Sequence, residues 1–432
     1  MRTSARASTP ICRSARRTSG GAERDGSPVT SGALGGFKVI DLGQAVSAPW
    51  CARLFADQGA DVIKVEPPRT GDVARQWGPF PGDVPDPEKS GLYFFLNTGK
   101  RGVTLDWARA AGRELLLELA SRADVLIDNH LPPQLRDLGL DYATLAQRNP
   151  DLVMISITPF GQTGPYRDWN GCDLNAFHLT AAGSRYCGRP GEAPLEHGTF
   201  AADFFGGAAG AAWGLAALLG RRAAGGGQQL DVACAEVIAA TFTGSQNIGA
   251  VALSGTFDRR TGVGMSLRAP ATILPCRDGH AWILAIEDAQ WQSLVRAMGS
   301  PAWAEAEPFR DLQMRAQNAD AMYPLLAEWT RAHSKWEIME RCQAEGVPVT
   351  AVFTVAEVAG HPHLRERGCI VELEHPALGR VRTLGAPFRL QGSELQPGRP
   401  APLLGEHNGE VYRDWLGLDD GELERLRAAG VL

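Results

Sequence analysis

KVIDLGQAVSAPWCARLFADQGADVIKVE, residues 38–66, places an apolar run, a helical pattern and a second apolar run in direct succession. Both apolar runs, 38–42 and 61–66, have the length and composition of strands. Between them we expect a helix that begins at Ser47 and ends at Gly59, because four large apolar residues recur at helical spacing: Trp50, Cys51, Leu54 and Phe55. The strands are continuously apolar rather than alternating, which predicts a parallel sheet covered on both faces.

The same alternation of strand and helix continues outward from this stretch. Further strands are predicted at 103–106, 124–129 and 152–157, with helices that carry Leu116 and Leu145 between them. This order is typical of a doubly wound α/β fold. We therefore predict a Rossmann-like large domain, followed by a smaller α/β domain beyond the segment GGGQQLDVAC.

The chain divides into five predicted segments. They are a disordered N-terminal extension (1–36), the N-terminal part of the large domain (37–234), a linker (235–260), the small domain (261–334), and a second linker with the C-terminal part of the large domain (335–432). The extension is rich in Arg and Ser and poor in acids, a composition that mitochondrial addresses share with unstructured extensions. We favour an unstructured extension of a cytoplasmic protein.

Charge and cysteine content argue against several classes of function. Lys and Arg number 43 and Asp and Glu 49, and the resulting net charge of −6 argues against nucleic-acid binding. No apolar run approaches the roughly 20 residues that a membrane helix needs, so we expect no membrane partner. The eight cysteines include no CxxC pair and only His361 and His363 are close together, so we predict neither a metal site nor a disulfide framework.

The first strand–turn–helix segment lacks the glycines of a dinucleotide site. Only Gly43 occurs where a GxGxxG pattern is required, which disfavours NAD or FAD. Two later segments, EPPRTGD and NTGKRG, place three cations beside glycines in predicted loops: Arg69, Lys100 and Arg101. Such cations suit a phosphate, although loop charges are more often simply solvated.

Two aspartates are candidates for acid chemistry. Asp203 lies directly before a glycine-rich helical segment (206–220), where it is either an N-cap or an ionised nucleophile near backbone N–H donors. Asp173 is either a cap for the following helix or a second acid in the same pocket. The adjacent Cys172 is predicted to be a packing residue, because a neighbouring carboxylate raises the pKa of a thiol.

Ordered segments from Phe37 to the C-terminus resemble the family III CoA transferases, a group that includes formyl-CoA:oxalate and carnitine CoA transferases and the related α-methylacyl-CoA racemases. The matching segments include LFADQGADVIKVE, NTGKRGVTLD, ADVLIDN, FGQTGPYRD, AADFFGG, GGGQQLDVA, GVPVTAV and PAPLLGEHN. The resemblance implies that Asp203 is the catalytic aspartate and Asp173 a second catalytic acid. It also implies CoA contacts from ten residues: Gln44, Val46, Ala48, Arg69, Asn97, Lys100, Arg101, Leu105, Asn129 and Arg136.

The reaction that the resemblance implies is transfer of CoA from an acyl-CoA to a carboxylic acid. It would pass through an aspartyl anhydride and an aspartyl-CoA thioester, without a prosthetic group or a metal. The alternative is an α-methylacyl-CoA racemase that moves an α-proton. That branch has a histidine where this chain has Cys172, which favours transfer. The resemblance further implies an interlocked homodimer.

The chain departs from the oxalate enzymes at several points. Val46 stands where they have a glutamine, and Arg136 precedes Asp137 in the reverse of the usual order. These departures argue against oxalate or formate and leave the acid open. A moderately hydrophobic acyl group is consistent with nearby aromatic residues, which are equally compatible with a core role: Trp50, Phe177, Phe204 and Phe205.

Overall fold

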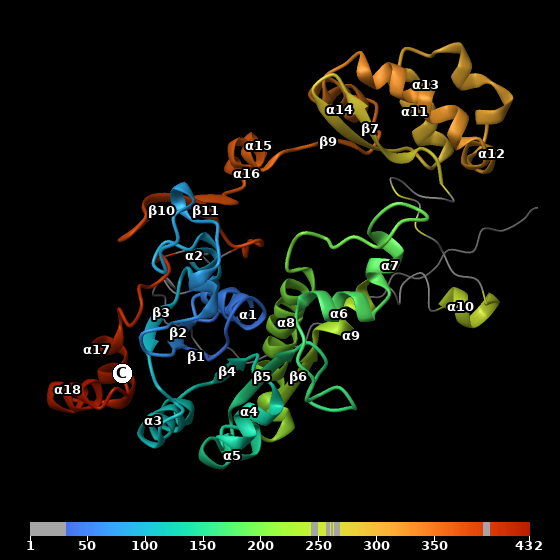
Figure 1. The fold of residues 1–432 in the computed structure, drawn as a ribbon. Coiled ribbons are helices and arrows are strands. Elements are labelled where there is room, and N and C mark those ends of the chain that lie inside the picture. The colour runs from blue at the N-terminus through green and yellow to red at the C-terminus, as the bar shows by residue number, and fades with distance from the viewer. Residues whose placement is uncertain (1–31, 243–248, 256–259, 261, 263–267, 392–397) are drawn as a thin grey trace, which may run out of the picture.

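The structure, a computed structural model, describes residues 32–242, 249–255, 260, 262, 268–391 and 398–432 (Figure 1). Most of the predicted extension, 1–36, lies outside the described residues. Its last residues do not belong to it, because Leu34 is buried and donates its backbone N–H to the carbonyl of Gln58. The packed part of the chain therefore begins before Phe37.

A six-stranded parallel sheet forms the centre of the large domain, as the continuously apolar strands predict. Its order is β3-β2-β1-β4-β5-β6, the order of a doubly wound Rossmann sheet. The strands are β1 (Lys38–Asp41), β2 (Asp61–Glu66), β3 (Arg101–Thr104), β4 (Val125–Asp128), β5 (Val153–Thr158) and β6 (Gln229–Ala233). The edge strand β6 was not predicted from the sequence.

Helices cover both faces of this sheet and divide its core in two. On one face, α1 and α8 pack against β5, with α6 and α9 beside them. On the other face, α3 and α5 pack with the C-terminal helices. The helices of this part are α1 (Ser47–Ala56), α2 (Gly91–Asn97), α3 (Ala110–Ser121), α4 (Pro132–Asp137), α5 (Tyr142–Arg148), α6 (Asp173–Leu179), α7 (Ala182–Tyr186), α8 (Ala201–Ala224) and α9 (Cys234–Ile238), with short turns η1 (Val73–Gln76) and η2 (Pro81–Asp83).

The long helix α8 lies close to α1 and β5 because glycines line its inner side. A Cβ atom at Gly207 would lie 2.4 Å from the carbonyl oxygen of Ser47, and one at Gly214 would lie 2.3 Å from Ile155 Cδ1. By length and composition α8 is apolar enough to cross a membrane, which corrects the prediction that this run is too short. Its packing against α1 and the sheet makes it a core helix of this domain.

A second, smaller unit has its own sheet and its own core. Three antiparallel strands are ordered β7-β8-β9, and they are β7 (Ala271–Cys276), β8 (Gly279–Leu284) and β9 (Val349–Val352). Around them lie α11 (Asp288–Ala297), η4 (Ala302–Glu305), η5 (Glu307–Phe309), α12 (Leu312–Gln317), α13 (Ala319–Arg331) and α14 (Lys335–Ala344). Because β9 pairs with β8 and α14 packs on both, the small unit extends past the predicted boundary at residue 334.

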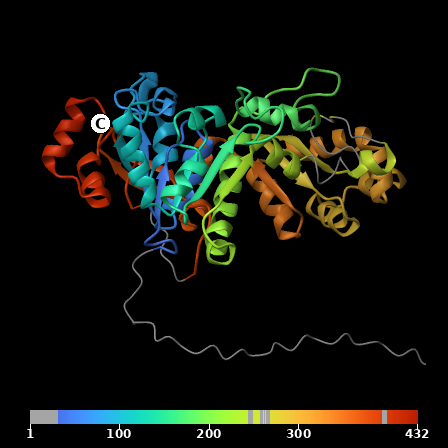
Figure 2. The same cartoon turned by 90° about the horizontal axis from the view of Figure 1, so that it is seen from below.

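The remaining elements connect the two units and close the large domain. They are α10 (Gly249–Ser254), α15 (Val355–Gly360), α16 (Pro362–Glu366), the hairpin of β10 (Ile370–His375) and β11 (Gly379–Leu384), α17 (Asn408–Val411), the π-helical turn η6 (Tyr412–Leu416) and α18 (Asp420–Ala428). Figure 2 shows the C-terminal helices at one end of the molecule and the small unit at the other. The large domain thus combines N-terminal and C-terminal parts of the chain.

Candidate active site

The carboxyl ends of β1 and β4 meet where the strand order reverses, and a side-chain clasp joins the two loops there. Asn129, which follows β4, accepts the backbone N–H of Gln44 at 2.9 Å and donates to the Gln44 carbonyl at 2.7 Å. The same amide donates to Ser47 Oγ at the start of α1. Ligands of open α/β sheets bind at such a reversal point, so the loops are in place for one.

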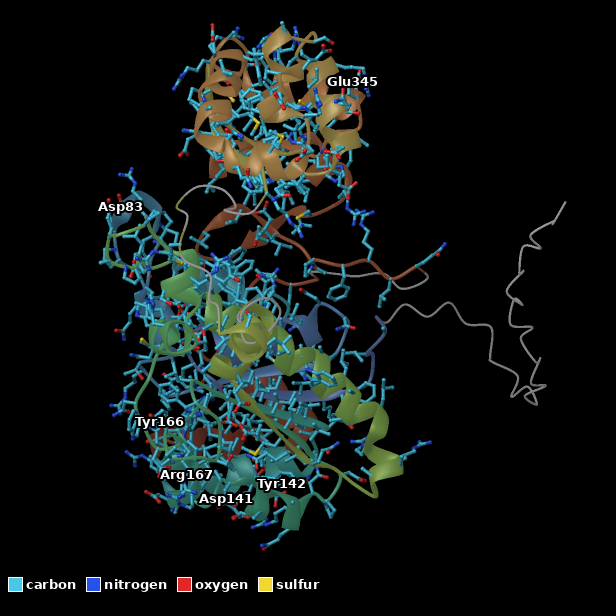
Figure 3. All side chains as sticks on the ribbon, turned by 90° about the vertical axis from the view of Figure 1, so that its right-hand side faces the viewer. Asp83, Asp141, Tyr142, Tyr166, Arg167 and Glu345 are labelled. Carbon is cyan, nitrogen blue, oxygen red and sulfur yellow. The ribbon has the colours of Figure 1, made fainter. Side chains whose placement is uncertain are left out.

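A cavity of about 550 Å³ opens beside this clasp. Its lining comes from the loops after β1 and β4, the residue after η1, the end of β5 and the loop after it, the start of α6, the segment before α8 and the start of α8: Ala45, Ser47, Trp77, Asn129, Ile157, Thr158, Pro159, Gly171, Cys172, Asp173, Leu174, Glu196, Gly198, Thr199, Phe200 and Asp203. Both candidate aspartates are among these residues. Tyr166 and Arg167, in the loop after β5, are on the side of the large domain away from the small unit (Figure 3).

Asp203 is the third residue of α8 and does not cap the helix. The N-cap position is Phe200, which makes no side-chain cap. The backbone N–H of Asp203 instead donates to Asp173 Oδ1 at 3.1 Å, so a neighbouring helix supplies an acceptor for the first turn. The N-cap alternative for Asp203 is therefore wrong, and its carboxylate is left to line the cavity.

Asp173 is the first residue of α6, is almost fully buried and also lines the cavity. One carboxylate oxygen accepts the N–H of Asp203, and the other lies 3.2 Å from Nε2 of His197. Of the two alternatives left open by the sequence, the second acid in the pocket is the one observed. Two carboxylates from different helices thus meet at one wall of the cavity.

The environment of Asp203 makes its carboxylate unusually basic. Burial, and then the nearby charge of Asp173, raise the pKa of Asp203 to about 7. Its environment thus favours the protonated form of Asp203 more than that of an ordinary exposed carboxylate. Burial and the same two carboxylates also raise the pKa of the Cys234 thiol, which lies behind them on α9.

Two of the three predicted phosphate-binding cations have partners inside the protein. Lys100 is fully buried, and its Nζ bonds to Asp41 Oδ2 at 2.7 Å and to Asn97 Oδ1 at 2.8 Å. Burial lowers the pKa of Lys100 to about 8. Arg101 lies in β3, not in a loop, and pairs with Asp61 of β2. Only Arg69 is exposed, in the loop after β2.

The other predicted CoA contacts fall into three groups. Gln44 and Asn129 form the clasp and Asn97 holds Lys100, as described above. Val46, Ala48 and Leu105 are fully buried, so their side chains serve the core. Arg136 is on the surface of α4 next to Asp137, with 54% of its side chain exposed. Contact between these residues and CoA stays a prediction.

Several cavity residues were missed from the sequence. Trp77 and Phe200 stack with ring centroids 5.7 Å apart and form the aromatic wall, whereas the aromatic residues proposed for the acyl group do not line the cavity. Glu196 lines the mouth and His197 lies directly behind Asp173. The segment that carries them, 187–200, has no periodic pattern, so no local signal places these side chains.

Comparison with known proteins agrees with the resemblance. The model of the family described as CoA-transferase family III matches residues 34–408. The chain is 31% identical to succinyl-CoA–D-citramalate CoA-transferase of Chloroflexus aurantiacus. The alignment extends over 403 residues and covers 92% of this chain and 98% of that protein. It is 32% identical over 383 residues to succinate–glutarate CoA-transferase of Agrobacterium fabrum, covering 88% and 95% of the two chains. The crystal structure of a CAIB/BAIF family protein from Brucella suis superimposes with a TM-score of 0.79 at 30% identity, covering 89% of this chain and all of that one.

Proposed function

The chain belongs to CoA-transferase family III, and on that premise we propose that it transfers CoA between carboxylic acids through covalent intermediates on Asp203. The family fixes the substrate classes as CoA thioesters and carboxylic acids. The observation that carries the role of Asp203 is its carboxylate at the wall of the cavity beside the β1–β4 reversal point. A thioester bound there would present its carbonyl carbon to that carboxylate.

The proposed reaction proceeds in two symmetrical halves. The Asp203 carboxylate attacks the thioester carbonyl carbon, the C–S bond breaks, and a mixed anhydride and CoA thiolate form. The thiolate then attacks the Asp203 carbonyl carbon of the anhydride, which releases the donor carboxylate and leaves an aspartyl-CoA thioester. The acceptor carboxylate repeats these steps in reverse and departs as the new acyl-CoA. One thioester replaces another, so no external energy source is required.

The local electrostatics suit an oxygen nucleophile. A carboxylate of higher pKa is more nucleophilic once ionised, and burial keeps water from competing with the acyl donor. The positive end of the 24-residue helix α8 lies at the same place and stabilises negative charge that develops on the carbonyl oxygen. Both effects act on Asp203 because it lies in the first turn.

The racemase alternative finds no support in the cavity. Two-base proton transfer at an α-carbon would need an imidazole or a similar base facing the substrate. The residue at the wall beside Asp173 is Cys172, and none of the lining residues in the described part of the chain is a histidine. His197 faces Asp173 rather than the cavity. Transfer is therefore the function that this geometry supports best.

CoA is proposed to bind across the β1–β4 reversal point, with its pantetheine end in the cavity. The exposed Arg69 is the predicted loop cation that remains accessible to a phosphate, because Lys100 and Arg101 are paired within the protein. We retain a cytoplasmic location as part of the proposal.

We also propose the homodimer that the family resemblance implies. Apolar side chains on α8 and α10 are widely exposed in the single chain, among them Trp213 at 65%, Leu219 at 88% and Leu253 at 91%. We propose that a partner subunit covers these side chains. Light scattering on the purified protein tests this directly: a mass of two chains is expected, and a monomer at micromolar concentration would contradict it.

Trapping the covalent intermediate tests the proposed function. The protein is incubated with acyl-CoA donors, treated with hydroxylamine and digested, and the peptide that contains Asp203 is weighed. We expect conversion of Asp203 to its hydroxamate, dependent on the acyl-CoA. Asp203→Asn keeps the shape of the side chain and should give neither adduct nor turnover. Modification elsewhere, or full turnover by Asp203→Asn, would overturn the proposal.

A further inference from the structure

His197 has no role in the reaction described so far, yet its ring is held beside the second acid of the cavity. The ring packs edge-on against Phe177 of α6 with centroids 4.2 Å apart, and 12% of the side chain is exposed. Gly198, with φ of 68°, turns the chain immediately after it. The imidazole is thus packed against α6 and largely shielded from solvent.

The ring nitrogens have distinct surroundings. Nδ1 accepts the backbone N–H of Thr199 at 3.4 Å, which assigns the proton of the neutral ring to Nε2. Nε2 is buried and lies 3.2 Å from Asp173 Oδ2. This close contact is not a hydrogen bond, and among the described residues Nε2 is a buried nitrogen without a hydrogen-bond partner. Its N–H therefore has Asp173 as its nearest anionic neighbour.

Asp173 also accepts a hydrogen bond from the first turn of α8, which carries the proposed nucleophile Asp203. Its other oxygen accepts the backbone N–H of Asp203 at 3.1 Å, so His197, Asp173 and Asp203 form a chain across α6 and α8. Around this chain the other ionisable groups are Glu196 at the mouth and the Cys234 thiol on α9. Neither supplies positive charge, and no Lys or Arg is among the residues that line the cavity in the described part of the chain.

We propose that His197 is a positioning residue for the transferase reaction: its Nε2–H orients Asp173 and compensates its charge, and Asp173 thereby sets the place and the charge of Asp203. The inference rests on the proposed function. Without the imidazole donor, the carboxylate of Asp173 would keep its negative charge with one neighbour fewer. Asp203 would then ionise less readily and its turn of α8 would be held less firmly.

A matched set of three variants tests the inference. His197→Phe keeps an aromatic ring against Phe177 and removes the N–H, whereas His197→Gln places an amide N–H near the position of Nε2. His178→Phe is the control, because His178 also packs edge-on against Phe177, at 5.7 Å, and is exposed on the outer side of α6. Thermal melting of all three variants shows whether each one folds.

The readouts are kcat, KM and the pH dependence of kcat/KM in the transferase assay. For His197→Phe we expect kcat to fall by roughly tenfold, equivalent to about 1.4 kcal/mol of barrier height, with KM for acyl-CoA nearly unchanged. The acidic limb of kcat/KM should move up by about 0.5 to 1 pH unit. His197→Gln should recover most of kcat and return the limb close to the wild-type position, and His178→Phe should behave as wild type.

Two outcomes would overturn the inference. One is a His197→Phe enzyme whose acidic limb and kcat match those of His178→Phe. The other is a His197→Gln enzyme that is as impaired as His197→Phe while both melt like the wild type. Adduct formation on Asp203 in the wild-type protein separates this result from failure of the proposed function: if the adduct forms, only the role of His197 is lost, and if it does not, the transferase mechanism itself falls.

Discussion

At the scale of single residues, the site depends on a carboxyl group held where it ionises poorly. Asp203 has a pKa of about 7, raised above its value in the unfolded chain by burial and by Asp173. A raised carboxyl pKa means that the unfolded chain releases its proton at lower pH. The folded state therefore loses stability as pH rises from about 4 to about 7, and the loss persists above that range. The protein maintains a reactive carboxylate at a cost in stability.

This sign gives a prediction for Asp203→Asn. At pH 8 the variant should be more stable to unfolding than the wild type by ~2–4 kcal/mol, because about three pKa units of ionisation penalty disappear. At pH 4 the two proteins should be equally stable. Urea unfolding at both pH values measures the difference. Asp137→Asn, at an exposed position on α4, controls for the loss of one negative charge and should show no comparable gain.

Residue types in the sequence identified Asp173 and Asp203 as candidates for acid chemistry, but they did not predict which groups contact these side chains in the fold. Asp173 and Asp203 are 30 residues apart in sequence, and only the packing of α6 on α8 brings the carboxylate of one to the backbone of the other. Likewise, Lys100 has the glycine-flanked pattern of a phosphate-binding loop, yet Asp41 at the end of β1 binds it in the core. Long-range partners of this kind leave no trace in local spacing.

At the scale of elements, local sequence patterns predicted the bounds of elements that are covered on all sides. Strand β2 occupies the predicted residues, and α1 begins at the predicted Ser47. The edge strand β6 was missed because QLDVA alternates polar and apolar residues and follows a run of glycines. Strand β9 lies in the segment that was predicted to belong to the second linker and the large domain, because its pairing with β8 is decided by tertiary packing rather than by composition.

The glycines of α8 allow an element-scale prediction with an internal control. Gly207→Ala should destabilise the protein by ~1–3 kcal/mol, because its Cβ would lie 2.4 Å from a backbone oxygen of α1. Gly220→Ala, in the same helix with no atom within 4 Å of the new Cβ, should stabilise it by up to ~1 kcal/mol through helix propensity. Calorimetric melting measures both. Equal effects of the two variants would show that α8 does not depend on close contact with α1.

At the scale of the whole molecule, the large domain is discontinuous in sequence. The small unit has a core of its own, whereas the C-terminal helices complete the core on one face of the large sheet. Trp415 in η6 is fully buried there, and its Nε1 donates to Asp61 Oδ2 at the start of β2 at 3.1 Å. Arg101 of β3 binds Glu410 and Asp414 across the same contact. The last residues of the chain therefore hold two of its first strands.

Removal of Trp415 should accordingly weaken the N-terminal strands and leave the small unit unchanged. Trp415→Ala creates a large cavity and leaves Asp61 without its indole donor, so we expect a loss of ~3–5 kcal/mol in the stability of the large domain. Hydrogen exchange with mass spectrometry should show faster exchange in β1, β2 and β3, with β7 and β8 unaffected. Trp169→Ala, in an exposed loop with 54% of the residue accessible, should leave all of these strands protected. Uniform loss of protection from exchange in both units would contradict this prediction. It would mean that the two units unfold together and that their interface, not two separate cores, determines the stability of the molecule.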